Sequence, residues 1–257
     1  MPFPQGWIVP DWPLPPNVHA VCTTRTGGHS WPPYDSLNLG DHVGDAPEAV
    51  AANRALFAQA IGARPLFLNQ VHGRSIALLT GDEPDGVEAD ACITSAPGVA
   101  CTIMVADCLP VLLALRDGSA VAAAHAGWRG LAGASGVGVL EAVWQGLQQH
   151  KGARADATMA WLGPCIGPEA FEVGPEVKAA FEAHDPEAAG LFRPHGTDKW
   201  LADLPGLARR RLRALGITQL YGNDGGPGWC TVANPSRFFS HRRDRVSGRF
   251  AAAIWRP

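Results

Sequence analysis

Two histidines and one cysteine in this chain have the residue types of a metal site with one open coordination position. His72 lies in Asn-Gln-Val-His-Gly, Cys108 in Ala-Asp-Cys-Leu-Pro and His125 in His-Ala-Gly-Trp-Arg-Gly. Zinc binds imidazole nitrogen and thiolate sulfur, and catalytic zinc sites typically combine three protein ligands with water or substrate. Such a metal would polarise a substrate oxygen or acidify a bound water. The three residues therefore predict an enzyme.

The same residues also allow chemistry without a metal. Cys108 would then be the nucleophile of an acyl or amide transfer, with His125 or His72 as general base. Spacing along the chain does not separate these two roles of Cys108. A cysteine and two histidines can also bind copper, so Cu²⁺ is an alternative to Zn²⁺. A complete multicopper centre needs more ligands in His-x-His pairs, and none of the nine histidines forms such a pair.

Polar residues in other motifs are candidates for substrate binding. Arg25 lies in Thr-Thr-Arg-Thr-Gly-Gly (23–28), a glycine-containing loop after a predicted strand, where its guanidinium and backbone amides could hold an anion. Arg129 could contact substrate or pair with a carboxylate such as Asp107. Arg242 lies in an aromatic and basic segment that suits either a pocket wall or an exposed turn. The predicted substrate-binding residues are Arg25, Asn38, Gln70, Arg129 and Arg242.

The elements that must position these residues are mainly short apolar runs with β character. We expect strands at Val18–Thr24, Leu66–Val71, Ser75–Thr80, Ala91–Thr94, Val99–Val105, Val111–Leu115, Ala120–Ala124, Thr158–Leu162 and Phe250–Trp255. The three candidate ligands lie at or near the ends of such runs. Helices are sparse between Leu66 and Leu115, so adjacent strands there are expected to be antiparallel and the fold class α+β.

Four helices have recognisable ends. Asp45 and Glu48 resemble a capping box, and Asp203 is a predicted N-cap. The helices are expected at Asp45–Ile61, Ser135–His150, Pro175–His184 and from Asp203 to a stop at Gly216. The stretch His184–Lys199, rich in proline, glycine and charge, is expected to be a long surface loop.

Composition narrows the function further. The 257 residues carry a formal charge of −3 and contain no apolar stretch of membrane-spanning length, so we expect one domain (1–257), no nucleic acid and no membrane. The six cysteines occur without an export signal or a Cys-x-x-Cys motif, so they are expected to be free thiols or ligands in a cytoplasmic protein.

The ordered motifs identify a family. The chain resembles the YfiH/YlmD-type proteins, long described as laccase-like multicopper polyphenol oxidoreductases. The motifs are Thr-Thr-Arg-Thr-Gly-Gly (23–28), Asn-Leu-Gly (38–40), Asn-Gln-Val-His-Gly (69–73), Ala-Asp-Cys-Leu-Pro (106–110), His-Ala-Gly-Trp-Arg-Gly (125–130), Gly-Pro-Cys-Ile-Gly (163–167) and Ser-His-Arg-Arg (240–243). The family often has alanine in place of Cys165 and tyrosine in place of His241, so the resemblance assigns neither a role.

The resemblance implies a CNF/YfiH-like α/β/β/α sandwich with mixed sheets and zinc ligands at His72, Cys108 and His125. It implies phosphorolysis of adenosine, inosine and methylthioadenosine, with adenosine deamination as a second reaction. The expected partners are therefore a purine nucleoside and phosphate, with Arg25 as the candidate phosphate or ribose ligand. Alternatives are amide cleavage in muramoyl-amino acid precursors of peptidoglycan and copper-dependent polyphenol oxidation. The expected assembly is a monomer or weak homo-oligomer.

Overall fold

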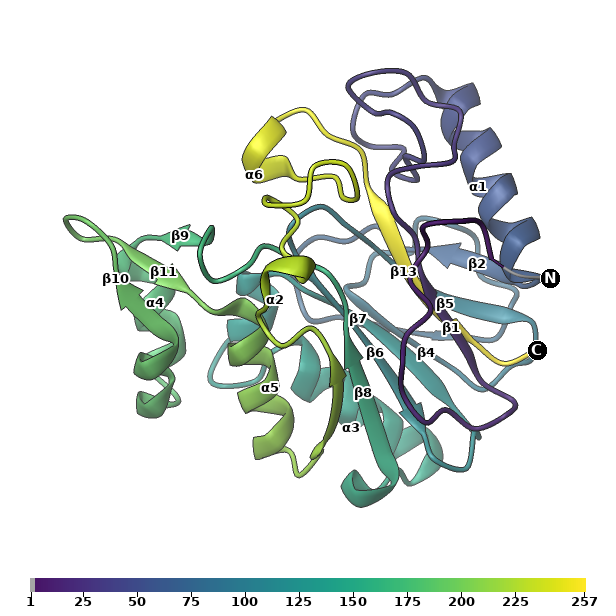
Figure 1. The fold of residues 1–257 in the computed structure, drawn as a ribbon. Coiled ribbons are helices and arrows are strands. Elements are labelled where there is room, and N and C mark those ends of the chain that lie inside the picture. Colours follow the sequence, from purple (N-terminus) through teal and green to yellow (C-terminus); the bar gives the residue numbers. More distant parts are fainter. Residues whose placement is uncertain (1–2) are drawn as a thin grey trace.

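Two β-sheets packed face to face form the centre of the molecule, with helices against their outer faces (Figure 1). This computed structural model describes residues 3–257. The four-stranded sheet has the order β1 (His19–Cys22), β13 (Phe250–Trp255), β5 (Val99–Val105) and β2 (Arg64–Phe67). The six-stranded sheet has the order β12 (Gln219–Gly222), β8 (Thr158–Leu162), β6 (Leu109–Leu115), β7 (Val121–Ala126), β4 (Ala91–Thr94) and β3 (Ile76–Leu79).

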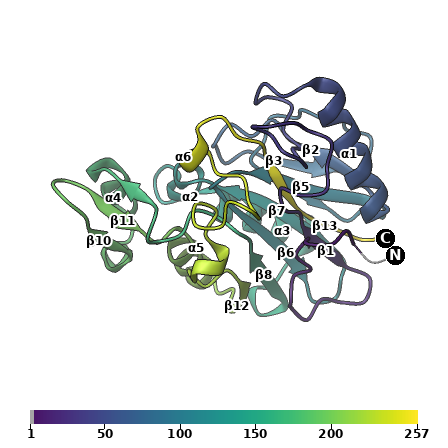
Figure 2. The same cartoon turned by 45° about the horizontal axis from the view of Figure 1, so that its top comes forward.

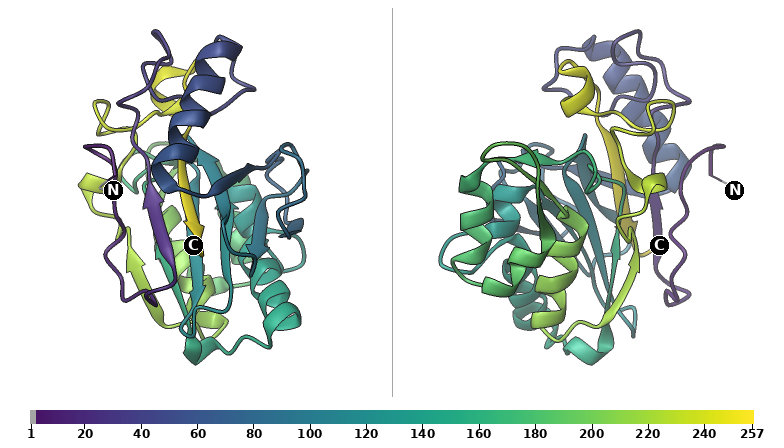
Figure 3. Two further views of the ribbon diagram at one scale, coloured as in Figure 1. Left: turned by 90° about the vertical axis from the view of Figure 1, so that its right-hand side faces the viewer. Right: turned by 60° about the vertical axis from the view of Figure 1, so that its left-hand side comes forward.

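Six α-helices and three 3₁₀ helices complete these layers within residues 3–257. The α-helices are α1 (Pro47–Ile61), α2 (Trp128–Ala132), α3 (Val139–Lys151), α4 (Pro175–Glu182), α5 (Leu204–Ala214) and α6 (His241–Asp244). The 3₁₀ helices are η1 (Ala155–Ala157), η2 (Pro186–Leu191) and η3 (Pro227–Trp229). Helix α1 covers the four-stranded sheet, whereas α3 lies on the opposite side against β3, β4 and β7 (Figure 3). None of these helices is long and apolar enough to cross a membrane.

Alternating side chains explain the layers. In β6, Leu112 and Ala114 contribute to the core between the sheets, whereas Val111 and Leu113 face the helices beyond the six-stranded sheet. Side chains alternate in this way because a strand has a period of two residues. Both faces of each central strand are therefore buried, which is why these strands are continuously apolar in sequence.

The strand pairing confirms an α+β fold with mixed sheets but corrects the antiparallel prediction. Pairs β2·β5, β3·β4 and β8·β12 are parallel, while β6·β7 and β4·β7 are antiparallel. Consecutive strands β5 and β6 belong to different sheets, so the chain crosses between the layers after β5. It also crosses after β2, because β2 and β3 lie in different sheets.

The helix boundaries confirm most of the predicted caps. Asp203 accepts a hydrogen bond from the Gly206 amide at the start of α5, and Gly62 ends α1 in the left-handed conformation. The capping box predicted at Asp45 is wrong, because Ala46 is the N-cap of α1. The Asp45 carboxylate instead accepts hydrogen bonds from Ser30 and Asn38.

The predicted long loop at 184–199 is wrong in part. This stretch contains η2 and the strand β10 (Phe192–Pro194), which pairs with β11 (Trp200–Ala202) and, through it, with β9 (Glu172–Val173). These strands and α4 extend away from the two main sheets (Figure 2). Their two or three residues are too short to give a strand pattern in sequence.

Candidate metal centre

Strand register brings Cys108 and His125 to one end of the six-stranded sheet. Pro110 pairs with His125 in the antiparallel β6·β7 ladder, so Cys108, just before β6, lies beside Gly127, just after β7. Both residues therefore lie next to the crossover from β5 to β6. A sheet whose register is set by a buried pattern holds such neighbours in place without help from a loop.

His72 arrives from the second crossover, between β2 and β3. The side-chain amide of the neighbouring Gln70 pairs with both backbone groups of Met104 at the end of β5, donating to the carbonyl at 2.8 Å and accepting from the amide at 2.9 Å. His72 has φ 62°, a conformation that non-glycine residues rarely adopt. The pairing with Met104 and the hydrogen bonds to Asp90 described next hold the loop in this conformation.

Asp90 binds both the backbone of the His72 loop and the ring of His125. Its fully buried carboxylate accepts hydrogen bonds from three consecutive amides, those of Val71 at 3.3 Å, His72 at 2.9 Å and Gly73 at 2.6 Å. It also lies 2.8 Å from Nδ1 of His125. One carboxylate thus fixes the backbone of His72 and the ring of His125, leaving Nε2 of His125 toward Cys108.

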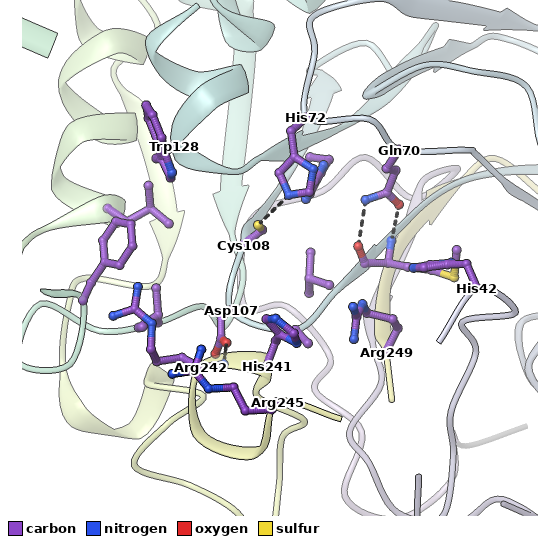
Figure 4. Close-up of a pocket in the computed structure, with 17 residues that line it drawn as sticks. His42, Gln70, His72, Asp107, Cys108, Trp128, His241, Arg242, Arg245 and Arg249 are labelled. Carbon is purple, nitrogen blue, oxygen red and sulfur yellow. Dashed lines mark hydrogen bonds between the residues drawn. The ribbon is translucent and has the colours of Figure 1, made fainter. Parts of the chain in front are cut away.

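The three side chains converge on one point. Sγ of Cys108 lies 3.6 Å from Nε2 of His72, and the two imidazole rings are 4.7 Å apart between centroids (Figure 4). All three candidate ligand atoms lie within 4.8 Å of one another. Zinc bonds of roughly 2.0–2.3 Å place two ligands of a tetrahedral ion about 3.5 Å apart, so the donor set fits one ion after a small contraction.

Electrostatics favours the thiolate of Cys108. Burial opposes its ionisation, but the charge of His125 and hydrogen bonds from both histidines outweigh burial and lower the pKa of Cys108 to about 6. Burial would lower the pKa of His125, yet the Cys108 thiolate and the Asp90 carboxylate raise it to about 9. The thiolate is the form that binds metals and attacks electrophiles. A metal would displace the proton from Nε2 of His125.

Two glycines of His-Ala-Gly-Trp-Arg-Gly leave room for this arrangement. A Cβ on Gly127 would lie 2.9 Å from Cδ2 of His72 and 3.0 Å from Sγ of Cys108. A Cβ on Gly130 would lie 2.7 Å from the carbonyl oxygen of Gly73. Glycine at these positions therefore lets the start of α2 pack directly against the ligands.

The donors open into a cavity of about 500 Å³. This volume lies within the roughly 300–1,000 Å³ of small-molecule pockets. Besides the three donors, its lining includes Gln70, the apolar side chains of Trp128, Ile166 and Phe171, and the basic residues His42, His241, Arg242, Arg245 and Arg249. The lining of the cavity thus combines apolar side chains with three arginines.

Of the predicted substrate-binding residues, Gln70 and Arg242 line this cavity, whereas Arg25, Asn38 and Arg129 do not. Arg25 donates hydrogen bonds to Asp35 and to the carbonyl of Pro235. Asn38 is fully buried and binds backbone groups of Gly40 and Arg249. The guanidinium of Arg129 stacks over the Trp128 ring at 4.5 Å. Their predicted contacts with substrate stay predictions.

Asp107 binds other partners than the predicted Arg129. Its carboxylate accepts hydrogen bonds from the Thr231 hydroxyl and from the Arg242 amide, each at 2.6 Å. Asp107 has φ 87°, so the turn that carries Cys108 contains a strained residue of the kind that clusters at functional sites. Cys165 is buried outside the cavity lining.

Sequence reasoning missed Asp90, Arg245 and Arg249 at this site. The sequence contains one signal for Asp90, because it is an acidic residue directly before an apolar strand. Arg249 had a similar signal, since it directly precedes β13. The side chain of Arg245 is exposed and gave no comparable signal.

Known proteins resemble the chain along nearly its full length. A family model described as multi-copper polyphenol oxidoreductase laccase matches residues 19–257. The chain is 49% identical over 250 residues to the purine nucleoside phosphorylase YfiH of Escherichia coli K12, which covers 96% of this chain and 98% of that protein. It is 48% identical over 252 residues to the purine nucleoside phosphorylase PA4543 of Pseudomonas aeruginosa, with 98% of each chain covered. The crystal structure of YlmD from Geobacillus stearothermophilus matches with a TM-score of 0.90 and 31% identity, over 100% of this chain and 98% of that chain.

Proposed function

We propose that this chain is a purine nucleoside phosphorylase, since it belongs to the YfiH/YlmD family, the family described as multi-copper polyphenol oxidoreductase laccase. The observation that carries the proposal is one cavity that contains the donors of His72, Cys108 and His125 together with apolar side chains and arginines. A nucleoside has a flat apolar base and a polar sugar, and phosphate is an anion, so such a cavity suits all three.

We propose that His72, Cys108 and His125 hold a zinc ion. The donor set favours zinc, because two imidazoles and a thiolate are its preferred ligands and Asp90 supplies the carboxylate that commonly orients a ligating histidine. When bound, zinc would act as a Lewis acid on a substrate oxygen or on water. Among residues 3–257, these three form one donor group, which suits a single ion.

Two reactions are proposed for adenosine at this site. In phosphorolysis, the bond between C1′ of ribose and N9 of the base breaks, a bond from C1′ to a phosphate oxygen forms, and the base gains the proton that phosphate loses. In deamination, water replaces the amino group at C6 and ammonia leaves. Inosine and methylthioadenosine are the other proposed substrates for phosphorolysis.

The chain's own residues bind and orient these substrates. Trp128 and Phe171 offer aromatic surface for the purine ring, while Gln70 and Arg242 are the proposed polar contacts. The strained turn at Asp107 and the hydrogen bonds of Asp90 keep the donor side chains fixed before substrate arrives. Prior orientation of this kind lowers the barrier, because no reorganisation is needed during the reaction.

Nucleophilic catalysis by Cys108 is the second candidate, and the lowered pKa of its thiol favours it. In that case Cys108 attacks a carbonyl carbon, as amide cleavage in a peptidoglycan precursor requires. Replacing Cys108 by alanine separates the two roles. Loss of bound metal together with activity identifies a ligand, whereas retained metal with lost activity identifies a nucleophile.

The decisive experiment combines metal analysis with product analysis. The protein is purified without added metal, its metal content is measured, and adenosine is incubated with the zinc-loaded protein with and without phosphate. We expect adenine and ribose 1-phosphate with phosphate, and inosine without it. If adenine, inosine and hypoxanthine are all absent, the purine assignment is wrong. Copper in the protein with oxygen consumption on a phenol would instead support polyphenol oxidation.

A further inference from the structure

We propose that Arg242, Arg245 and Arg249 form the subsite that binds inorganic phosphate in the cavity of the metal donors. This inference rests on the proposed function, because phosphorolysis needs a phosphate dianion next to the sugar. Figure 4 shows Arg242 and Arg245 next to each other and Arg249 beyond His241, all on the side of the cavity away from His72. Arg25, predicted from the sequence as the candidate phosphate or ribose ligand, lies outside this cavity.

These arginines lack ion-pair partners among residues 3–257. Many other arginines of the chain form ion pairs with carboxylates, as Arg54, Arg210, Arg211 and Arg243 do. None of the three cavity arginines is paired with a carboxylate among residues 3–257. Arginine side chains in a cavity that form no ion pair attract an anion, and the planar guanidinium matches a phosphate oxygen pair.

The carboxylate in the cavity lining forms no ion pair with these arginines. Asp107 lines the cavity, but its oxygens accept the Thr231 hydroxyl and the backbone amide of Arg242. The second of these hydrogen bonds ties the segment that carries Arg242 and Arg245 to the turn that carries Cys108. Asp107 therefore positions the arginines relative to the donors without forming an ion pair with them.

The fold also holds the backbone and the side chain of Arg249 in place. Phe250 pairs with Val105 in the antiparallel β5·β13 ladder, so Arg249 lies beside the turn that leads to Cys108. The backbone amide of Arg249 donates to the side-chain oxygen of buried Asn38 at 2.8 Å. A Cβ on Gly40 would lie 2.7 Å from Cγ of Arg249. The Asn-Leu-Gly motif thus leaves room for the Arg249 side chain and holds its backbone.

Two histidines accompany these arginines. His42 and His241 also line the cavity. The guanidinium of Arg249 contributes to lowering the pKa of His42, after burial, so Arg249 and His42 are close enough for their charges to interact. Several fixed donors around one small volume are what a doubly charged oxyanion requires.

The subsite predicts that the two adenosine reactions respond differently to mutation. Phosphorolysis consumes phosphate, whereas deamination consumes water, so loss of an arginine reduces the first far more than the second. The test uses the zinc-loaded full chain with Arg245→Gln and Arg249→Gln. Arg245 is exposed, so its variant is expected to fold even if the Arg249 variant does not. Arg213→Gln is the matched control, because Arg213 is an exposed arginine outside this cavity and without an ion pair among residues 3–257.

Two readouts are measured. Calorimetric titration with inorganic phosphate is expected to show about tenfold weaker binding for each cavity variant, the loss typical of one charged contact, and unchanged binding for the control. The ratio of phosphorolysis to deamination of adenosine is expected to fall by about tenfold or more in the same variants. Phosphate binding and a reaction ratio that both match the wild-type protein would overturn the subsite.

Two further arms separate the possible failures. If wild-type protein binds phosphate through these arginines but turns over no purine nucleoside, the proposed function fails and the subsite stands. If it cleaves adenosine with phosphate and the variants keep the same KM for phosphate, the subsite fails and the function stands. Adenosine 5′-monophosphate is titrated as the other source of a phosphate group. Arginine-dependent binding of this nucleotide, with none for inorganic phosphate, would overturn the assignment to free phosphate.

Discussion

At the scale of single residues, Asp90 does the most to organise the candidate metal centre without contributing a ligand. Its buried carboxylate holds the amides of the His72 loop and the ring of His125 at the same time. Burial raises the pKa of a carboxyl, but hydrogen bonds and the charge of His125 outweigh burial here and lower the pKa of Asp90. Asp90 is therefore ionised at neutral pH, and the ionised form accepts all of these hydrogen bonds.

Replacing Asp90 by asparagine is expected to weaken metal binding and stability together. The amide group offers one oxygen and places N–H donors against the donors of the His72 loop. We expect zinc affinity to fall about 10–100-fold, as for other partners of ligating histidines. We expect a loss of about 2–3 kcal/mol in the free energy of unfolding. Competition with a chromophoric chelator and urea titration measure the two effects.

A matched control for this variant is Asp117→Asn. Asp117 also accepts a backbone amide, that of Ser119, but in the turn between β6 and β7, away from the cavity lining. It is expected to keep wild-type zinc affinity. A zinc affinity of the Asp90 variant within about twofold of wild type would show that Asp90 does not orient the ligands.

At the scale of elements, strand register explains why distant residues meet. The β4·β7 pairing sets Ala91 against Ala124, so Asp90 comes beside His125, and the β6·β7 pairing brings Cys108 beside Gly127. A loop positions the third candidate ligand, His72. Gln70 pairs with Met104 like an added strand residue, and this pairing fixes the entry of the His72 loop.

The turn after β3 gives an element whose stability depends on pH. The Glu83 carboxylate accepts hydrogen bonds from the amides of Thr80 and Gly81 and from the Thr80 hydroxyl. Burial opposes ionisation, but these donors outweigh it and lower the pKa of Glu83 to about 2. The pKa of Glu83 is lower in the folded chain than in the unfolded chain. The stabilisation of the folded state by the Glu83 carboxylate is therefore complete above the ordinary glutamate pKa and is lost as pH falls toward 2.

The variant Glu83→Gln is expected to be less stable than wild type by about 0.5–1 kcal/mol near neutral pH, a modest value because the turn is solvated. The difference should shrink as pH falls from 4.5 toward 2, because over this range Glu83 takes up a proton in the unfolded wild-type chain before it does so in the folded one. Urea unfolding of both proteins across this range measures it. A difference that stays constant with pH would mean that the charge of Glu83 does not stabilise the turn.

At the scale of the whole molecule, the candidate metal centre lies where the chain crosses between its two sheets. His72 follows β2 of the four-stranded sheet, whereas Cys108 and His125 lie at one end of the central strands β6 and β7 of the six-stranded sheet. A bound ion would therefore tie the crossover to the second sheet. The single domain over 1–257 and the monomer or weak homo-oligomer stay predictions.

Metal removal is expected to destabilise the whole molecule. An ion present at about 100 times its dissociation constant adds about 2.7 kcal/mol to the stability of the folded state. For a chain of this size, that corresponds to a fall in Tm of roughly 5–10 °C when a chelator removes the ion. Calorimetry with and without chelator measures the shift. The variant Cys108→Ala is the control, and a chelator that shifts both proteins equally would argue against metal bound at Cys108.

The sequence by itself determined the apolar strands, most helix caps and the candidate triad, because these depend on local periodicity, capping chemistry and residue type. Val99–Val105 and Ala91–Thr94 match β5 and β4 at both ends, and the apolar face of α3 is buried as its spacing predicts. The ordered motifs also identified the family, because seven of them occur in the expected order.

Only the tertiary structure decided which strands share a sheet and which polar residues face the cavity. Arg25 and Arg249 both lie in polar segments next to strands, yet Arg25 pairs with Asp35 while Arg249 enters the cavity. The parallel pairs and the crossovers between sheets, which decide this, arise from contacts between residues far apart in the chain. Local propensity does not encode such contacts, because each strand could bury its apolar faces against several partners.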